Sequence, residues 1–318
     1  MGRASTVLVV GPTFLDSIYG GLPSMPELGQ EVYGDGHLLT VGGFAITAIG
    51  LARLGVKTLL ATAIGDDLFG NFIEERLTRE GVSTRALQRL CGRPTNSTTA
   101  FVYQGDRGFI SYRGAELPES ELVARWEESR GAPLNHISHL HIGLREDPGI
   151  LQVLQRARKH SVITFLTCGW DGVELYGHRE DALKTILGST NYFLCNQKEA
   201  VALTGQSNLK SAIQALFAYG CHPVITLGSE GALTLDENQR TIQQPAIQVD
   251  FVDPTGAGDS FAAGFIAGQW LGWSIDDSMR LGVVCGSLST QALGGTEGFP
   301  RSLEDVLAYI PSHDSIPE

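Results

Sequence analysis

The sequence predicts an α/β protein in which helices cover both faces of a mainly parallel central sheet, with a small antiparallel sheet standing apart as a lid. β-rich and helix-like segments alternate along most of the chain, which is the pattern of a parallel sheet covered by helices. Two helix-free stretches, 17–41 and 96–113, interrupt this alternation. No low-complexity linker or internal repeat is present, so residues 1–318 are expected to form a single domain plus the lid.

The main elements follow two hydrophobic patterns. Segments rich in β-branched residues predict strands at Thr6–Val10, Thr58–Ile64, Ile137–Ile142, Val162–Leu166, Tyr192–Leu194 and Val224–Leu227. Apolar residues at helical spacing predict helices at Phe44–Leu54, Leu68–Arg79, Gly149–Lys159, Asp181–Leu187, Lys198–Leu203 and Leu209–Tyr219. In the lid, 17–41 is rich in glycine and proline, and 96–113 reads as a hairpin that turns at Gly105-Asp106. A small sheet beside a crevice is typical of a lid over an active site.

Composition excludes several classes of protein. The formal net charge of −12 opposes binding to nucleic acid or an anionic membrane. The five cysteines are scattered and form no CxxC pair, so neither a zinc site nor a disulfide framework is expected. The apolar run near the N-terminus is too short to span a membrane and lacks a cleavage pattern, so the protein is expected to be cytoplasmic.

The stretch DPTGAGDSFAAGF, residues 253–265, is the strongest candidate for a site. Ala246–Val252 before it alternates like a strand, and Ser260–Leu271 after it is an apolar helix with Gly264 and Gly268 on one face. Small residues at such a turn leave backbone amides uncovered, and the helix start adds partial positive charge. This arrangement binds anions. The alternative is an ordinary capped helix with an acid in its first turn.

Asp259 gives this stretch a chemical interpretation. The chain contains no GxxxxGK[ST] motif, and Phe261 stands where a dinucleotide fingerprint requires its third glycine. A carboxylate beside a bound phosphate suits a general base that deprotonates an alcohol during phosphoryl transfer. The exposed amides would then stabilise the phosphoryl group in flight.

Residues 253–265 resemble the C-terminal signature of the ribokinase-like (PfkB) sugar kinase family. Four further segments resemble motifs of that family in the same order, so the resemblance extends from about residue 6 to residue 300: Gly42-Gly43, 64–70 (IGDDLFG), 196–199 (NQKE) and 226–231 (TLGSEG). It implies a three-layer α/β/α sandwich with a β-sheet lid, and ATP-dependent phosphorylation of a sugar with Mg²⁺.

The resemblance also implies roles for individual residues. Asp259 would be the base, and the amides of Gly256, Ala257 and Gly258 would form the anion hole. Asp16 would accept hydrogen bonds from substrate hydroxyls, although a turn residue is the alternative reading.

Three further positions would border the sugar, namely Gly42, Gly43 and Thr47. Thr47 replaces a frequent Asn, and Phe44 replaces the Lys of ribokinase proper, which argues against ribose itself. Residues 165–171 (FLTCGWD) lack the Asp-x-Asn-x-Arg run of the fructose-type and ketogluconate-type kinases, which argues against those substrates too.

On the nucleotide side, Asn196 and Glu199 would organise Mg²⁺ through water, while Thr226 and Gly228 would face the nucleotide. The alternative for the first pair is a helix capping box, and both roles can coexist. Asp253 and Thr255 match a loop that holds K⁺ in many members, although Pro254 replaces the usual Thr there.

Two predictions concern the lid. Its aromatic residues would supply an apolar face for a homodimer: Phe101, Tyr103, Phe109 and Tyr112. Arg107 either reaches a phosphate or is solvated, and it stays outside the predicted site. Two alternatives to a sugar kinase remain: a nucleoside kinase of the same fold, which a more apolar lid face would favour, and a catalytically idle sensor of a sugar or nucleotide.

Overall fold

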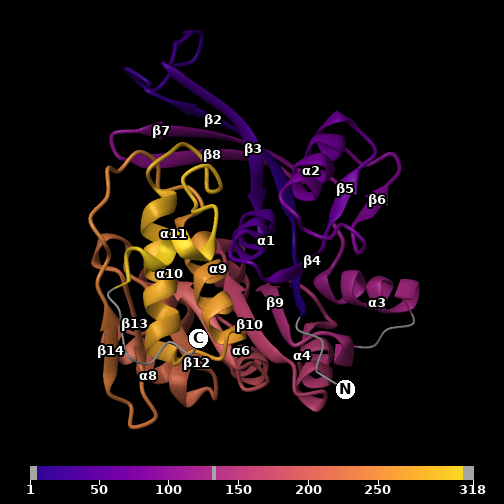
Figure 1. Cartoon of the computed structure of the whole chain (residues 1–318), viewed down its shortest axis with the longest axis vertical. Helices are drawn as coiled ribbons and strands as arrows, with labels where there is room; N and C mark the ends of the chain where they lie inside the picture. Colours follow the sequence, from indigo (N-terminus) through magenta and orange to yellow (C-terminus); the bar gives the residue numbers. More distant parts are fainter. Residues whose placement is uncertain (1–5, 131–133, 311–318) are drawn as a thin grey trace.

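The computed structural model describes residues 6–130 and 134–310, within which the central sheet has eight strands (Figure 1). Their order is β14-β13-β12-β11-β10-β9-β1-β4. The strands from β12 to β4 in this order run parallel, whereas β13 is antiparallel to β12 and β14 is antiparallel to β13. Their bounds are β1 Thr6–Val10, β4 Lys57–Ala61, β9 His139–Leu144, β10 Ile163–Cys168, β11 Tyr192–Asn196, β12 His222–Thr226, β13 Ala232–Leu235 and β14 Thr241–Gln244. The predicted mainly parallel sheet is confirmed.

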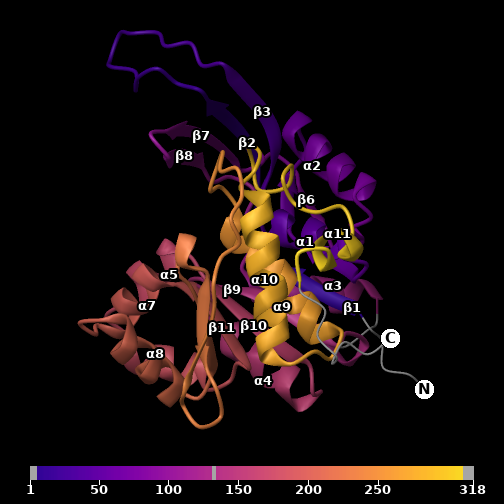
Figure 2. The same ribbon diagram turned by 60° about the vertical axis from the view of Figure 1, so that its left-hand side comes forward.

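Helices cover both faces of this sheet, so the molecule has three layers (Figure 2). One layer contains α1 Phe44–Arg53, α2 Leu68–Arg79, α9 Ala257–Trp270, α10 Ile275–Ser289 and α11 Leu303–Leu307. The other contains α3 Glu119–Arg130, α4 Ile150–Lys159, α5 Trp170–Tyr176, α6 Glu180–Leu187, α7 Gln197–Thr204 and α8 Leu209–Ala218. Successive side chains of β1 alternate between the two cores, with Val7 and Val9 in one and Leu8 and Val10 in the other.

The small residues of α9 allow it to pack closely against α10. A Cβ added to Gly264 would lie 2.7 Å from the Leu281 carbonyl oxygen, and one added to Gly268 would lie 2.6 Å from the Ser278 hydroxyl oxygen. Only glycine therefore fits on this face of α9. This contact buries the apolar helix that follows the Gly-Ala-Gly-Asp turn and holds its N-terminus in place.

A second, small sheet lies above the central one in Figure 1, with the order β3-β2-β7-β8. Its strands are β2 Thr13–Gly20, β3 Gly36–Gly43, β7 Ser97–Tyr103 and β8 Asp106–Tyr112. The pairings of β2 with β3 and of β7 with β8 are antiparallel, and β2 pairs with β7 in parallel. The predicted hairpin is confirmed, with Gln104 and Gly105 at positive φ in its turn.

Several segments differ from the prediction. Ala246–Val252 was predicted as a strand but is irregular, because the chain leaves the sheet edge at Pro245 and crosses to the start of α9. The predicted strand Thr58–Ile64 is divided between β4 and β5 Ala63–Gly65, and β5 pairs with β6 Gln88–Leu90. The sequence analysis did not predict α3, α5, α10, β13 or β14, nor the short 3₁₀ helices η1 Leu134–His136 and η2 Gly228–Glu230.

Candidate active site

The carboxyl ends of the parallel strands face the small sheet, and most of the predicted site residues lie at this edge (Figure 1). Asn196 ends β11 and is paired in register with Thr226, which ends β12. In open parallel sheets, ligands bind at the carboxyl ends of the strands. The edge between the central and small sheets is therefore the candidate active site.

The turn before α9 is held by the buried carboxylate of Asp253. Its Oδ1 accepts hydrogen bonds from the Thr255 amide (2.9 Å) and the Thr255 hydroxyl (2.7 Å). Its Oδ2 accepts a hydrogen bond from the Gly294 amide at 2.8 Å. A carboxylate with three internal donors fixes the shape of a loop. Asp253 thus joins this turn to the loop that follows α10.

Gly256 caps α9 in the left-handed conformation, with φ of 72°. A Cβ here would lie 2.6 Å from Gly295 Cα and 2.8 Å from the Ile46 side chain, so only glycine fits. Among the described residues, the amides of Gly256 and Gly258 donate no hydrogen bond, while the Ala257 amide donates to the Pro254 carbonyl at 3.3 Å. Two unpaired amides at the start of a buried helix can bind an anion.

Asp259 lies in the first turn of α9 beside these amides and is half-buried. Burial, and then the negative charge of Glu199, raise the pKa of its carboxyl to about 7, while the positive charge of Arg107 acts in the opposite direction. A carboxyl with a pKa near neutrality has the protonation behaviour of a general base.

Asp16 lies on β2 of the small sheet, with 7% of its surface exposed. A Cβ added to Gly42 would lie 2.1 Å from Asp16 Oδ2, so glycine makes room for this carboxylate. Burial, followed by the negative charges of Asp259 and Asp253, raises the pKa of Asp16 to about 7. Carboxylates from the small sheet and from α9 therefore act on one another across the candidate site.

The helix that follows Gly42-Gly43 contacts the same region. Gly43 has φ of 64° and precedes α1. Thr47 is fully buried, and its hydroxyl donates to the backbone carbonyl of Asp259 at 3.1 Å. The structure thus places Thr47 against α9, where it positions the helix that carries Asp259.

The ring of Phe44 lies so close to Gly11 and Gly143 that a larger side chain at either position would contact it. A Cβ added to Gly11 would lie 2.3 Å from the Phe44 ring, and one added to Gly143 would lie 3.1 Å from it. The ring also lies 5.0 Å from that of buried His141. The aromatic ring of Phe44 therefore fills the space beside Gly11 and Gly143 at the start of α1.

The β11–α7 junction contains the capping box that the sequence analysis offered as an alternative, and this prediction is confirmed. The Glu199 amide donates to Asn196 Oδ1 at 2.9 Å, and the Asn196 amide donates to Glu199 Oε2 at 2.8 Å. Burial raises the pKa of Glu199 to about 7. Just after β12, Gly228 has φ of 65°, and no atom lies within 4 Å of the position that a Cβ would take.

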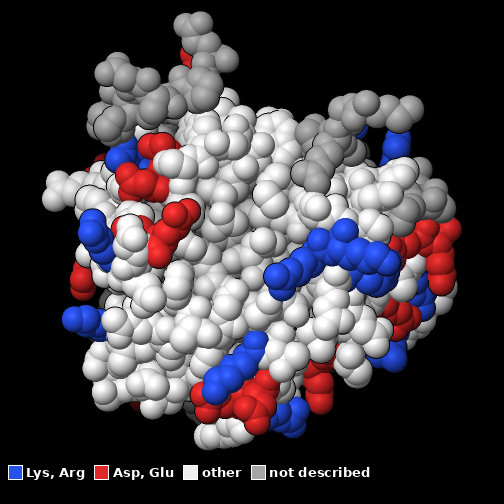
Figure 3. Space-filling view, turned by 90° about the horizontal axis from the view of Figure 1, so that it is seen from below, with Lys and Arg blue, Asp and Glu red and all other residues white. Residues whose placement is uncertain are grey.

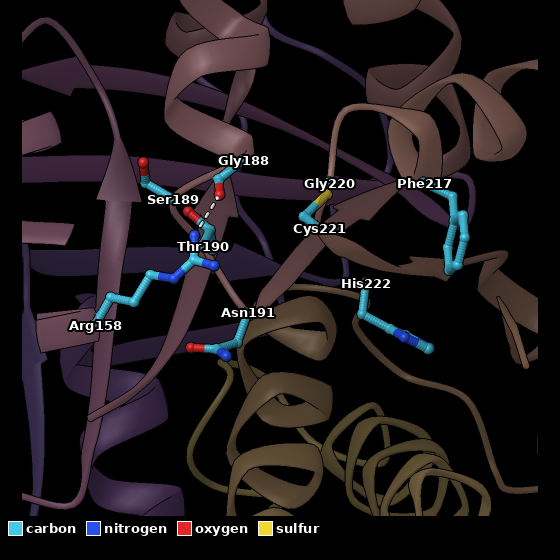
Figure 4. Close-up of a pocket in the computed structure, with 9 residues that line it drawn as sticks. All are labelled: Arg158, Gly188, Ser189, Thr190, Asn191, Phe217, Gly220, Cys221 and His222. Atoms are coloured by element: carbon cyan, nitrogen blue, oxygen red, sulfur yellow. Dashed lines mark hydrogen bonds between the residues drawn. The ribbon is translucent and has the colours of Figure 1, made fainter. Parts of the chain in front are cut away.

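Two cavities help to delimit the site. One of about 400 Å³ lies among residues that precede β11 and β12, including Asn191 and Cys221, and Arg158 donates to the Gly188 carbonyl there (Figure 4). It opens at the amino ends of the strands, away from Asp259. The second, of about 740 Å³, is lined by residues that follow β9 and β10, including Arg145 and Asp171. This second cavity lies at the same strand ends as the candidate site.

The register of the small sheet separates its aromatic residues. Phe109 pairs with Ala100, and Tyr112 pairs with Ser97, three residues apart on each strand. Because side chains alternate between faces, Phe109 lies on the face opposite to that of Phe101, Tyr103 and Tyr112. The expectation that these four aromatic residues share one face is therefore wrong.

Sequence analysis missed several residues that shape the site. Gly294 and Gly295 hold the turn before α9, and Thr296 Oγ1 lies 3.1 Å from Thr40 Oγ1 on β3.

Among the described residues, no group of three or more His, Cys, Asp or Glu side chains is arranged to hold a metal ion. The surface opposite the small sheet carries basic and acidic side chains side by side in several places (Figure 3). No described helix has the length and apolar character needed to cross a membrane.

A three-layer α/β fold with unpaired amides at a helix start beside an acid of near-neutral pKa is the arrangement expected of a kinase that phosphorylates a small alcohol. Residues 30–301 match the pfkB family carbohydrate kinase, and the chain belongs to this family. It is 29% identical over 301 residues to the ribokinase of Lactococcus lactis, covering 90% of this chain and 91% of the relative.

Two further similarities concern a curated relative and a solved structure. The chain is 28% identical over 275 residues to the cytidine kinase of Thermococcus kodakarensis, covering 85% of this chain and 94% of the relative. The structure of Arabidopsis thaliana ribokinase complexed with ribose and ATP superposes with a TM-score of 0.77 at 23% identity, covering 96% of this chain and 99% of that one. The ribokinase-like fold is thus confirmed.

Proposed function

We propose that this protein transfers the γ-phosphate of ATP to a hydroxyl of a sugar or sugar-like substrate, with Asp259 as the general base. One observation carries this proposal. A carboxyl whose pKa is raised to about 7 lies directly beside unpaired amides at the start of a buried helix. This juxtaposition suits the removal of a proton from an alcohol next to a bound phosphate.

The chain's own residues account for each part of the transfer. The Asp16 carboxylate accepts hydrogen bonds from substrate hydroxyls, and Gly42 and Gly43 allow the backbone to approach the substrate. The Asp259 carboxylate takes the proton of the reacting hydroxyl, whose oxygen bonds to phosphorus as the bond to the ADP oxygen breaks. The amides of Gly256, Ala257 and Gly258 stabilise charge on the phosphoryl group, with those of Gly256 and Gly258 the more available.

The nucleotide side suits a hydrated Mg²⁺. Glu199 is the carboxylate proposed to act on the metal ion, but one of its oxygens already accepts a hydrogen bond in the capping box with Asn196. Among the described residues, no group of three potential ligands is arranged for direct coordination of a metal ion. Mg²⁺ keeps several waters and binds through phosphates, so Glu199 and Asn196 would hold it through water, and it would neutralise phosphate charge. Thr226 and Gly228 would contact the nucleotide.

The proposal includes a monovalent cation at the turn before α9. The internal hydrogen bonds of Asp253 already shape the turn, and Thr255 supplies two of the three donors. K⁺ would add ligation to this turn. Replacement of K⁺ by Na⁺ in the assay tests it, and equal turnover in both salts would remove K⁺ from the site.

A nucleoside kinase is the second candidate function, and one structural observation favours it. Phe109 is 50% exposed and lies on the face of the small sheet that carries Asp16. An exposed aromatic ring on this face could stack on a nucleobase. Turnover of nucleosides together with its loss in Phe109→Ala, but not in Tyr112→Ala on the other face, would select this function.

We further propose that the chain is one cytoplasmic kinase unit whose small sheet acts as a lid, and that two lids form a homodimer. The outer face of that sheet exposes large apolar side chains: Tyr19, Leu39, Ile110 and Tyr112. Such faces usually pack against a partner. Light scattering tests this; a monomeric mass that Ile110→Asp leaves unchanged would contradict it.

A substrate panel tests the main proposal. ATP consumption is measured with sugars and nucleosides for the wild type, Asp259→Asn and the exposed control Asp250→Asn. Loss of a general base is expected to lower kcat by about 10²–10⁴-fold, with the control unchanged. Wild-type-like turnover in Asp259→Asn would remove this residue from the mechanism. Nucleotide or sugar binding without any turnover would support the idle-sensor alternative.

A further inference from the structure

His141 is a polar side chain buried in an apolar core without a partner. It lies on β9 with no exposed surface, and neither of its ring nitrogens has a hydrogen-bond partner among the described residues. Its register neighbours on β1 and β10 are Val9 and Phe165, which both belong to that core. Burial lowers the pKa of the imidazole to about 3, so the ring is neutral and offers one donor and one acceptor. Leaving both unmatched costs stability, which a role in packing alone does not explain.

Two glycines leave the space between His141 and the carboxyl edge of the sheet. Gly143 is the next residue of β9 on the same face, because side chains on one face of a strand are two residues apart. Gly11 stands two residues beyond Val9, the register partner of His141. The Phe44 ring fills this space: a Cβ at either glycine would meet it, and its centre lies 5.0 Å from that of the imidazole. Ligands of open parallel sheets bind at this edge, so the ring covers His141 where a ligand is expected.

Phe44 also borders the segment that is proposed to bind the acceptor. It is the first residue of α1 and directly follows Gly42-Gly43, and Gly42 makes room for the Asp16 carboxylate. Phe44 keeps 9% of its surface exposed, whereas His141 below it has none. Because the two glycines beneath the ring have no side chains, nothing on them interlocks with the ring and opposes its rotation. Phe44 is thus placed as a cover between the candidate site and His141.

We propose that His141 is a further acceptor-binding residue: the Phe44 ring turns aside when the acceptor enters, and the imidazole then hydrogen-bonds to an uncharged hydroxyl. This inference rests on the proposed phosphoryl transfer. A hydroxyl both donates and accepts, so it suits whichever ring nitrogen faces it. A carboxylate or a phosphate would need a cation, and the neighbours Val9 and Phe165 supply none. The part of the acceptor that reaches His141 is therefore neutral, as in a sugar or the ribose of a nucleoside, and is not the carboxylate of a sugar acid.

The experiment compares His141→Leu and His141→Gln with the control His222→Leu. Nε2 of His222 is also buried without a partner among the described residues, but His222 begins β12 at the opposite edge of the sheet. His141→Leu should raise the KM of the acceptor about 5–10-fold, as expected for loss of one hydrogen bond to an uncharged group, and leave ATP affinity unchanged. Its melting temperature should hold or rise, because two unmatched polar atoms leave the core. His141→Gln, whose amide keeps a donor and an acceptor, should lose less affinity, and the control should keep the wild-type KM.

Phe44→Ala tests the cover directly. Without the ring, the cost of turning it aside is absent, so the KM of the acceptor should fall about 3–10-fold. That gain should disappear when His141→Leu is added, since the freed space then holds no polar group. A KM that rises equally in the single and the double variant would mean that Phe44 only supports the fold, and it would overturn the inference.

The imidazole NMR signals of His141, assigned by their absence in His141→Leu, give a readout besides activity. The probe is the best acceptor of the substrate panel, or D-ribose and cytidine in turn where the panel gives no turnover, and adding it should shift these signals. An active wild type whose His141 signals do not move, and whose acceptor KM is unchanged in His141→Leu, overturns the inference and leaves the proposed function standing. A wild type without turnover opposes the proposed function, and unmoved His141 signals with both probes then overturn the inference as well.

Discussion

The hydroxyl of Thr47 donates a 3.1 Å hydrogen bond to the backbone carbonyl of Asp259. Thr47 is fully buried in α1, which follows the Gly42-Gly43 pair, and Asp259 lies in the first turn of α9. The two helices that begin at the two glycine-rich segments are therefore tied at the position of the proposed base. The segments that we propose to bind the substrate and the phosphate are thus joined directly by this hydrogen bond.

Replacement of Thr47 by Val should disturb the position of Asp259. The substitution keeps the shape of the side chain but leaves a buried carbonyl with one acceptor position empty, at a cost of about 1 kcal/mol in the free energy of unfolding. A small shift of the base should lower kcat by about 5–10-fold. Thr78→Val is the control, since its hydroxyl bonds to Glu74 on the exposed face of α2. Equal effects of the two variants on kcat would contradict the prediction.

Activity should depend on the ionisation of Asp259. Its pKa is raised to about 7 by burial and by Glu199, and the base must be ionised to accept a proton. We therefore expect kcat/KM to be level above about pH 7 and to decrease about tenfold for each pH unit below it. A profile that stays flat to pH 5 would show that a group of ordinary carboxyl pKa, or none, controls the rate.

Replacement of Asp16 by Asn should stabilise the free protein, and only at higher pH. The folded-state pKa of Asp16 is about 7 against 3.8 for an ordinary Asp, so the folded state binds more protons than the unfolded state between these values. The wild type therefore loses stability as pH rises through this window, and Asn does not titrate. The melting temperature of Asp16→Asn minus that of the wild type should grow from pH 4.5 to pH 7.5.

The control for this experiment is Asp106→Asn, whose carboxyl is largely exposed. Its melting temperature should follow that of the wild type at every pH. A difference for Asp16→Asn that shrinks as pH rises would mean that the Asp16 carboxylate is stabilised, rather than destabilised, by its surroundings.

Gly258→Ala should separate stability from function. No atom lies within 4 Å of the added Cβ, and alanine favours a helix over glycine by about 0.5–1 kcal/mol, so the melting temperature should hold or rise. The methyl group would enter the open space beside the unpaired amides, where the phosphate is proposed to bind, and kcat/KM should fall at least about 10-fold. Retained activity would place the phosphate elsewhere.

Gly264→Ala in the same helix provides the opposite case. Its Cβ would lie 2.7 Å from the Leu281 carbonyl oxygen, so the variant should unfold at a lower temperature. Together the two variants distinguish a glycine that opens the site from a glycine that packs α9 against α10.

The sequence alone determined the class of fold and the position of the proposed base along the chain. Hydrophobic periodicity, and the Gly-Ala-Gly-Asp turn with its capped helix, are encoded by residues close together in sequence. The same holds for the Asn196–Glu199 capping box and for the hairpin of residues 96–113, both of which the structure confirms, although the turn lies at Gln104-Gly105, one residue before the predicted Gly105-Asp106.

Only the tertiary structure decided which distant groups meet. The loop at Gly294–Thr296 that supports the turn, the bond from Thr47 to Asp259 and the irregular path of Ala246–Val252 depend on contacts between remote segments. The faces of Arg107 and Phe109 depend on strand register, and a shift of one residue would turn both side chains to the other side of the sheet. The near-neutral pKa of Asp259 likewise arises from burial and from charges on other elements, which no local pattern specifies.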